Sequence, residues 1–128
     1  MLLFVADKVR QGLFEYVPTS RIAESVDIPA PTLVKLVGAL HGAGIIDTRE
    51  GRAGGVRLAM APEEVSLALI FEAVEQSRPL FRSDLRFHVQ GTKPKKAHAA
   101  IVSALDRAEM AMRSALRETS LADLLAEI

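Results

Sequence analysis

The chain has 128 residues, close to the size of one domain, which excludes an enzyme built from separate cofactor and substrate domains. Its hydrophobic fraction of 49% and charged fraction of 25% are typical of a globular protein, and the absence of cysteine excludes disulfides, thiolate nucleophiles and cysteine-ligated metal centres. Because 16 basic residues balance 16 acidic residues, any anion-binding surface must come from local clustering of charge.

The first segment of the chain predicts an amphipathic helix that ends near Tyr16. Apolar residues recur there every three or four positions, at Leu2, Val5, Val9 and Leu13. Pro18 cannot continue a helix and closes the segment. The apolar run at the start is far too short to span a bilayer and lacks the features of a secretory signal, so we expect a cytoplasmic protein with no membrane partner.

A short helix over residues 21–25 is expected next. Thr19 or Ser20 offers a side-chain oxygen to the first free amides of this helix. Ile22 faces inward, and Asp27 marks the end of the helix. The sequence therefore predicts a tight turn before the following helix.

That following helix should begin at Pro31, because proline is tolerated in a first helical turn and disfavours helical backbone in the residue before it. Gly42 and Gly44 fit its end, where a left-handed residue is common. Its buried stripe consists of Leu33, Leu36, Val37 and Leu40.

The outward face of this helix holds the first candidate binding residues, which are Thr32, Val34, Lys35 and Gly38. Lys35 can neutralise a phosphate or donate to a guanine edge, and Thr32 can donate to a phosphate or touch a thymine methyl group. Taken alone, a single lysine is more often an ordinary solvated residue.

A β-ribbon follows, with strands expected at residues 45–49 and 56–59. The glycines between them permit a tight reversal, and the arginines concentrate positive charge where the backbone can approach a polyanion. Glu50 offsets part of this charge, and the alternative is a flexible hairpin with solubilising arginines. A nucleotide phosphate loop is excluded, because no lysine with serine or threonine ends the glycine-rich run. The candidates at this turn are Arg49, Gly51, Arg52, Gly54, Gly55 and Arg57.

The rest of the chain predicts helices, apart from residues 77–93, where periodicity is poor. Ser66 caps a helix through Val74, Pro94 opens the longest helix, and Ser120 caps a last helix over residues 121–128.

The long helix has about 24 residues and spans roughly 36 Å, so part of its apolar stripe must meet another surface. A second copy of the chain is the simplest partner, and a helix folded back on its own domain is the alternative. The expected interface residues are Ala97, Ile101, Ala104, Leu105, Ala108, Met112 and Leu116.

This order of elements predicts a mainly α fold with a small β-hairpin wing, namely a winged helix-turn-helix followed by a long dimerisation helix. The helix at Pro31 is narrow enough for the DNA major groove, and the ribbon tip can reach phosphates or the minor groove. We expect a DNA-binding domain at residues 1–76, a hinge or effector loop at 77–93, and dimerisation and C-terminal helices at 94–128.

The chain resembles the Rrf2 family of bacterial transcription regulators in several segments taken together. These segments are residues 22–28, 33–40, 43–46, 51–55, 65–75 and 119–125. That family includes the iron-sulfur cluster regulator, the nitric-oxide-sensitive repressor and the cysteine-metabolism repressor. The resemblance implies a homodimer on a partly palindromic operator, with the helix at Pro31 in the major groove and the wing in the minor groove. It places the DNA-contacting stretch at Pro29 to Lys35, which adds Pro29 and Pro31 to the candidates, and the wing at Gly51 to Gly55.

The sequence departs from the family pattern in the wing and in the sensing region. Glu50 stands where an arginine is usual and Val56 where an aromatic residue is usual, so Arg49 or Arg52 would have to substitute. Many relatives place three cysteines in the stretch that corresponds to residues 77–91. This chain has none, so it resembles the cysteine-free branch, which uses no iron-sulfur cofactor.

Basic residues in the same stretch could line a pocket for an anionic small-molecule effector. In the alternative, which we favour, the apolar residues there pack the hinge and the arginines remain in water. The three histidines of the chain are too widely separated to predict a metal site. The effector candidates are Arg78, Arg82, Arg86 and His88.

We therefore expect a sequence-specific DNA-binding transcription regulator. It would be a homodimeric repressor that binds double-stranded DNA and needs no cofactor. The alternative is a winged-helix protein-interaction module that docks a partner protein through the helix at Pro31 and does not bind DNA. An enzyme is not expected, because no strand-to-helix nucleophile turn accompanies the serine, histidine and aspartate residues.

Overall fold

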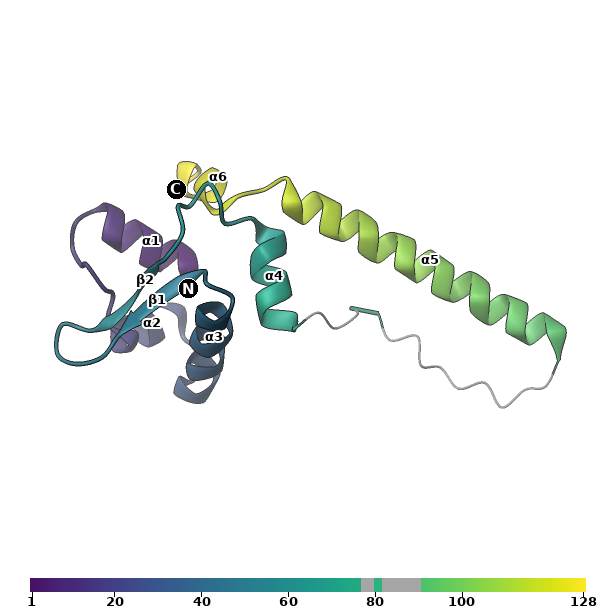
Figure 1. Cartoon of the computed structure of the whole chain (residues 1–128), viewed down its shortest axis with the longest axis horizontal. Helices are drawn as coiled ribbons and strands as arrows, with labels where there is room; N and C mark the ends of the chain where they lie inside the picture. The colour runs from purple at the N-terminus through teal and green to yellow at the C-terminus, as the bar shows by residue number, and fades with distance from the viewer. Residues whose placement is uncertain (77–79, 82–90) are drawn as a thin grey trace.

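The computed structural model describes residues 1–76, 80–81 and 91–128, and Figure 1 shows a mainly helical chain with one antiparallel hairpin. This arrangement confirms the predicted fold class of an α protein with a small β wing. In chain order the elements are α1 (Leu2–Arg10), α2 (Thr19–Val26), α3 (Ala30–Gly42), β1 (Ile46–Arg49), β2 (Gly55–Leu58), α4 (Leu67–Glu75), α5 (Thr92–Arg117) and α6 (Leu121–Ala126).

The first helix is shorter than its periodicity predicts, because Gly12 ends it. Helix α1 stops at Arg10, so the prediction of an end near Tyr16 is wrong. Gly12 takes a left-handed φ of 70°, and its N–H donates to the carbonyl of Val9 at 2.9 Å, a common way to close a helix. Leu13, which the periodicity placed on the buried face, is instead exposed.

Helices α2 and α3 form the helix-turn-helix, and Asp27 lies in the turn between them. Its left-handed backbone, with a φ of 48°, confirms the predicted end of the first of these helices. Pro29 is the N-cap of α3, so the helix begins one residue before the predicted Pro31. At the other end Gly44, and not Gly42, adopts the left-handed conformation, with a φ of 72°.

The wing is the antiparallel pair of β1 and β2, whose register places Asp47 opposite Arg57. Because side chains alternate across a strand, Asp47, Arg49 and Arg57 share the solvent face of the hairpin. Ile46 and Val56 point the other way and are buried. The hairpin therefore has one apolar face on the core and one charged face in water.

The hydrophobic core joins the two ends of the chain. The N–H of Leu121 donates to the carbonyl of Val65 at 2.8 Å, and the N–H of Leu67 donates to the carbonyl of Thr119 at 2.9 Å. The winged domain therefore includes α6, and its core extends beyond residues 1–76. Its buried members are Leu2, Val5, Ala6, Val17, Ile22, Leu33, Leu40, Ile45, Ile46, Val56, Val65, Leu121 and Leu125.

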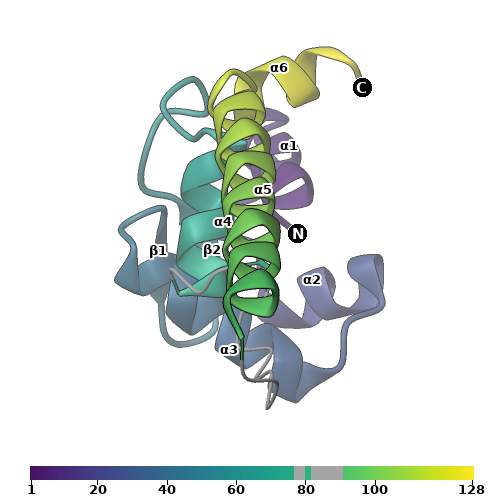
Figure 2. The ribbon, with the colours of Figure 1, turned by 90° about the vertical axis from the view of Figure 1, so that its right-hand side faces the viewer.

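Helix α5 projects from this core as a long arm (Figure 1), and none of its 26 residues is buried. Its C-terminal end is fixed to α4 through Arg113, whose guanidinium lies 5.2 Å from the ring centroid of Phe71. The same guanidinium pairs with Glu72 at 3.5 Å and with Glu109 at 3.0 Å. Viewed from the side of the arm, α5 passes in front of α4, which it contacts (Figure 2).

Candidate nucleic-acid interface

The outward side of α3 presents every side chain that the sequence placed there. Val34 is the most exposed apolar residue among them, at 70%. On the inward side Leu33 and Leu40 are buried, while Leu36 and Val37 are half-buried. The helix thus offers an accessible face made of Pro29, Pro31, Thr32, Val34, Lys35 and Gly38.

A groove of about 520 Å³ lies between the wing and the helix-turn-helix. Thr19 and Ser20 from the start of α2 and Val37 from α3 form its helical side. The wing and the helix-turn-helix therefore share one concave surface. The predicted residues that line its wing side are Arg49, Gly51, Arg52, Gly54 and Gly55.

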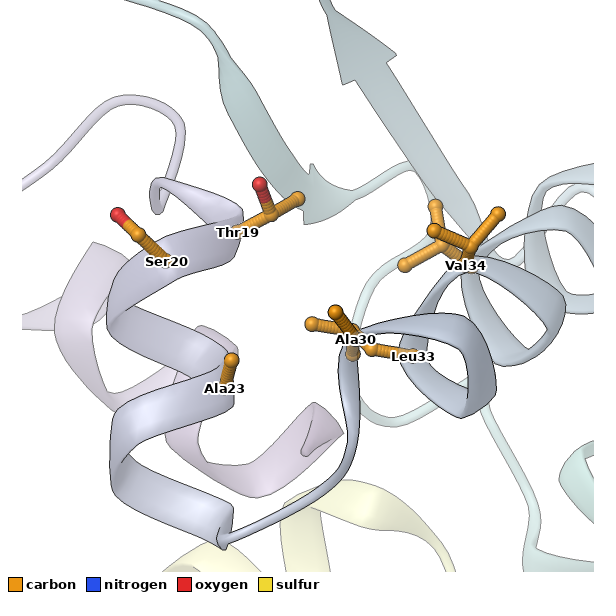
Figure 3. Close-up of a pocket in the computed structure, with 7 residues that line it drawn as sticks. Thr19, Ser20, Ala23, Ala30, Leu33 and Val34 are labelled. Carbon is orange, nitrogen blue, oxygen red and sulfur yellow. The ribbon is translucent and has the colours of Figure 1, made fainter.

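An apolar pocket of about 330 Å³ continues this groove between α2 and α3 (Figure 3). Thr19, Ser20 and Val37 line both hollows. The sequence predicted a capping role for Thr19 or Ser20, but no side-chain hydrogen bond caps α2, so this prediction is wrong. Both hydroxyl residues are exposed beside the groove, a position that only the folded arrangement reveals.

Two wing glycines are required by the fold itself. Gly54 is buried, and a Cβ there would overlap the carbonyl oxygen of Arg49. Gly55 has a φ of 147°, and its Cβ would overlap the backbone of Val17. Gly51 also has a positive φ, of 97°, but faces open space. Of these three glycines, only Gly51 therefore has open space where a side chain would begin.

The basic residues of this surface fall into two groups. Lys35 and Arg52 are exposed, and neither takes part in an ion pair within residues 1–76, 80–81 and 91–128. Arg49 and Arg57 instead lie 3.7 Å and 3.9 Å from the same carboxylate oxygen of Glu15. Lys35 and Arg52 are therefore the basic residues of the predicted set that form no ion pair in this part of the chain, while the exposed carboxylate of Glu50 lines the same groove as Arg52.

The arm exposes a regular stripe of small and apolar residues. Ala97, Ile101, Ala104 and Ala108 of the predicted interface are exposed, and they recur at the spacing of a coiled-coil seam. The other predicted interface residues, Leu105, Met112 and Leu116, are half-buried. The arm therefore has an apolar face that none of the described residues covers.

The proposed effector residues Arg78, Arg82, Arg86 and His88 lie outside the described residues. Among the residues that the structure describes, no group of three or more histidine, aspartate or glutamate side chains could hold a metal ion. None of the helices in these residues combines the length and the hydrophobicity that a bilayer-spanning segment needs.

Solved structures of known proteins share this fold. IscR of T. potens superposes with a TM-score of 0.69 over 98% of this chain and 78% of its own, at 23% identity. The cysteine regulator CymR of B. subtilis gives a TM-score of 0.68 over 99% of this chain and 88% of its own, at 21% identity. These structures show a shared winged-helix architecture that includes the arm.

Curated relatives match between about half and two thirds of the chain. A Synechocystis sp. protein, slr0846, whose name describes an HTH-type transcriptional regulator, is 45% identical over 65 residues, which are 49% of this chain and 44% of that protein. NsrR of Halalkalibacterium halodurans is 31% identical over 80 residues, which are 62% of this chain and 53% of NsrR. The chain thus spans about half the length of these curated relatives.

The model of the Rrf2 family, described as an iron-dependent transcriptional regulator, matches residues 2–127. The residues of this chain do not fit a cysteine-ligated iron cluster, because the sequence contains no cysteine. With almost the whole chain covered by the family model, the protein belongs to the Rrf2 family and lacks the thiolates that would hold such a cluster.

Proposed function

We propose that this protein is a DNA-binding transcription regulator that acts as a homodimeric repressor in the cytoplasm without an iron-sulfur cluster. The observation that carries the proposal is the concave surface shared by the wing and the helix-turn-helix. Lys35 on α3 and Arg52 on the wing bring to this region positive charge that no ion pair among the described residues neutralises. The role requires recognition and no catalysis.

The geometry supports a division of labour between helix and wing. An exposed helix of this kind fits the major groove of B-DNA, where Thr32 and Lys35 reach phosphates or base edges. The wing then lies along the neighbouring backbone, where Arg52 neutralises a phosphate and Gly51 permits close approach. The proposed DNA-contacting residues are Pro29, Pro31, Thr32, Val34, Lys35, Gly38, Arg49, Gly51, Arg52, Gly54, Gly55 and Arg57.

The arm supports the homodimer. Its exposed face would pack against the same face of a second copy, with alanines allowing close approach and Ile101 filling the space between them. Because Arg113 fixes the arm to α4, the dimer would hold two winged domains at a set separation. In this proposal the winged domain with α6 binds DNA and α5 dimerises.

The test is selection of bound fragments from fragmented genomic DNA of the source organism, followed by footprinting of the recovered sites. We expect partly palindromic sites whose half-sites lie about one helical turn apart, roughly 34–36 Å. A dimer that retains no duplex DNA even at low salt would contradict the proposal. Retention of a protein partner by that same dimer would identify an interaction module in its place.

A further inference from the structure

On the solvent face of the wing, two arginine guanidinium groups lie over the ring of one tyrosine. The Cζ atoms of Arg49 and Arg57 lie 4.5 Å and 4.7 Å from the ring centroid of Tyr16. The tyrosine is only 9% exposed, whereas the two arginine side chains above its ring are exposed at the surface. Two like charges on one ring repel each other and need a counter-charge nearby.

Glu15 supplies that counter-charge through a single oxygen. Its Oε1 lies 3.7 Å from Nη1 of Arg49 and 3.9 Å from Nη1 of Arg57. Glu15 belongs to the segment between α1 and α2, not to the wing, and its side chain is 67% exposed. Long, exposed ion pairs of this kind are weak and are screened by salt.

A second carboxylate in the cluster acts on only one of the arginines. Asp47 lies 3.5 Å from Nη2 of Arg57, directly across the hairpin. Arg49 is the arginine that also lines the groove between the wing and the helix-turn-helix, and Glu15 is its ion-pair partner. Glu15 is therefore the carboxylate within ion-pair distance of Arg49, and Glu50 is a further acidic residue that lines the same groove.

We infer that Glu15 competes with DNA phosphate for Arg49 and Arg57 and thereby lowers the general DNA affinity of the wing. This inference rests on the proposed DNA-binding function and adds a residue that tunes it. When a phosphate approaches, Arg49 exchanges the carboxylate of Glu15 for a phosphate oxygen, while the ring of Tyr16 keeps the guanidinium at the surface. Phosphate contacts carry no sequence information, so Glu15 suppresses binding to any sequence and leaves discrimination to α3.

The experiment compares Glu15→Gln with the unmodified full chain on a fluorescent duplex of mixed sequence, about three helical turns long, over a range of KCl concentrations. Gln keeps the size of the side chain and removes its charge. We expect affinity to rise about three- to tenfold at low salt and the salt dependence to steepen, because more positive charge becomes available to phosphate. The matched control is Glu127→Gln, an exposed carboxylate in the residues after α6, which should change neither quantity.

A double-mutant cycle separates competition for the arginines from a general change in net charge. In a chain that already carries Arg49→Ala and Arg57→Ala, Glu15→Gln should have no effect on affinity. An equal gain in both backgrounds would overturn the inference, as would unchanged affinity of Glu15→Gln when the unmodified chain binds. If neither chain binds duplex DNA at low salt, the proposed function fails and the inference fails with it.

Discussion

The backbone of Val17 packs against Gly55 and fills the space in which a side chain at position 55 would begin. The N–H of Val17 donates to the carbonyl of Val56 at 2.8 Å, and the N–H of Val56 donates to the carbonyl of Val17 at 2.9 Å. This close approach attaches the wing to the segment that leads into α2. The position of the wing beside the helix-turn-helix therefore depends on a residue without a Cβ.

Replacing Gly55 with alanine should destabilise the protein by about 1–3 kcal/mol, since the new Cβ overlaps backbone and the φ of 147° is one that other residues rarely adopt. Urea denaturation monitored by circular dichroism measures the loss. A stability equal to that of the unmodified chain would show that the wing does not hold this contact.

Gly38 provides the opposite case within α3. Its backbone is helical, and a Cβ there would meet nothing within 4 Å. Gly38→Ala should therefore raise the free energy of unfolding by about 0.5–1 kcal/mol, because alanine loses less conformational freedom than glycine in a helix. The same denaturation experiment checks it, and a loss of stability would indicate a neighbour that the structure does not contain.

Asp123 predicts a pH-dependent contribution to stability from the capping box of α6. Its Oδ2 accepts hydrogen bonds from the hydroxyl and the backbone N–H of Ser120, both at 2.7 Å, and these bonds lower the pKa of Asp123 below its usual value of 3.8. A lowered folded pKa means that this contribution is complete above the unfolded pKa and is lost as pH falls through the folded value.

Asp123→Asn should therefore be less stable than the unmodified chain near neutral pH, and the difference should disappear in strong acid. Denaturation curves at several pH values measure this difference. A gap between the two proteins that stays constant down to the lowest pH would argue against the capping role of the carboxylate.

Ile101 lies at 45% exposure on the apolar stripe of the arm. A buried glutamate without a partner is strongly unfavourable, so Ile101→Glu should convert a homodimer to a monomer while the winged domain stays folded. Sedimentation velocity measures the mass, and Ser103→Glu, two residues on and on another side of the helix, should remain dimeric. A dimer that survives Ile101→Glu would place the interface elsewhere.

The sequence predicts the order of the elements well, because capping residues and breakers are local signals. Ser66 accepts a hydrogen bond from the N–H of Leu69 at 3.1 Å, as its position before a helix predicts. The error at the end of α1 has the same local origin. There Gly12 overrode an apolar periodicity that continued as far as Leu13.

The candidate site is less accessible to sequence reasoning, because it depends on contacts between distant segments. Charge clustering alone treats Arg49, Arg52 and Arg57 as equivalent. Their difference arises from Glu15, which reaches the wing from the segment before α2. Likewise, the sequence indicates only that Gly55 belongs to the turn. The structure shows that the backbone of Val17 leaves no room for a side chain at this position.

The central claim is that α3 and the wing hold DNA through Lys35 and Arg52, and it is tested most directly by the salt dependence of operator binding in Lys35→Ala and Arg52→Ala. Each substitution should lower the slope of log affinity against log salt by about one unit and leave the dimer intact, because each removes one phosphate contact. Lys96→Ala, an exposed lysine near the start of α5, should leave the slope unchanged. Affinity and slope that match the unmodified protein in both Lys35→Ala and Arg52→Ala would contradict this account.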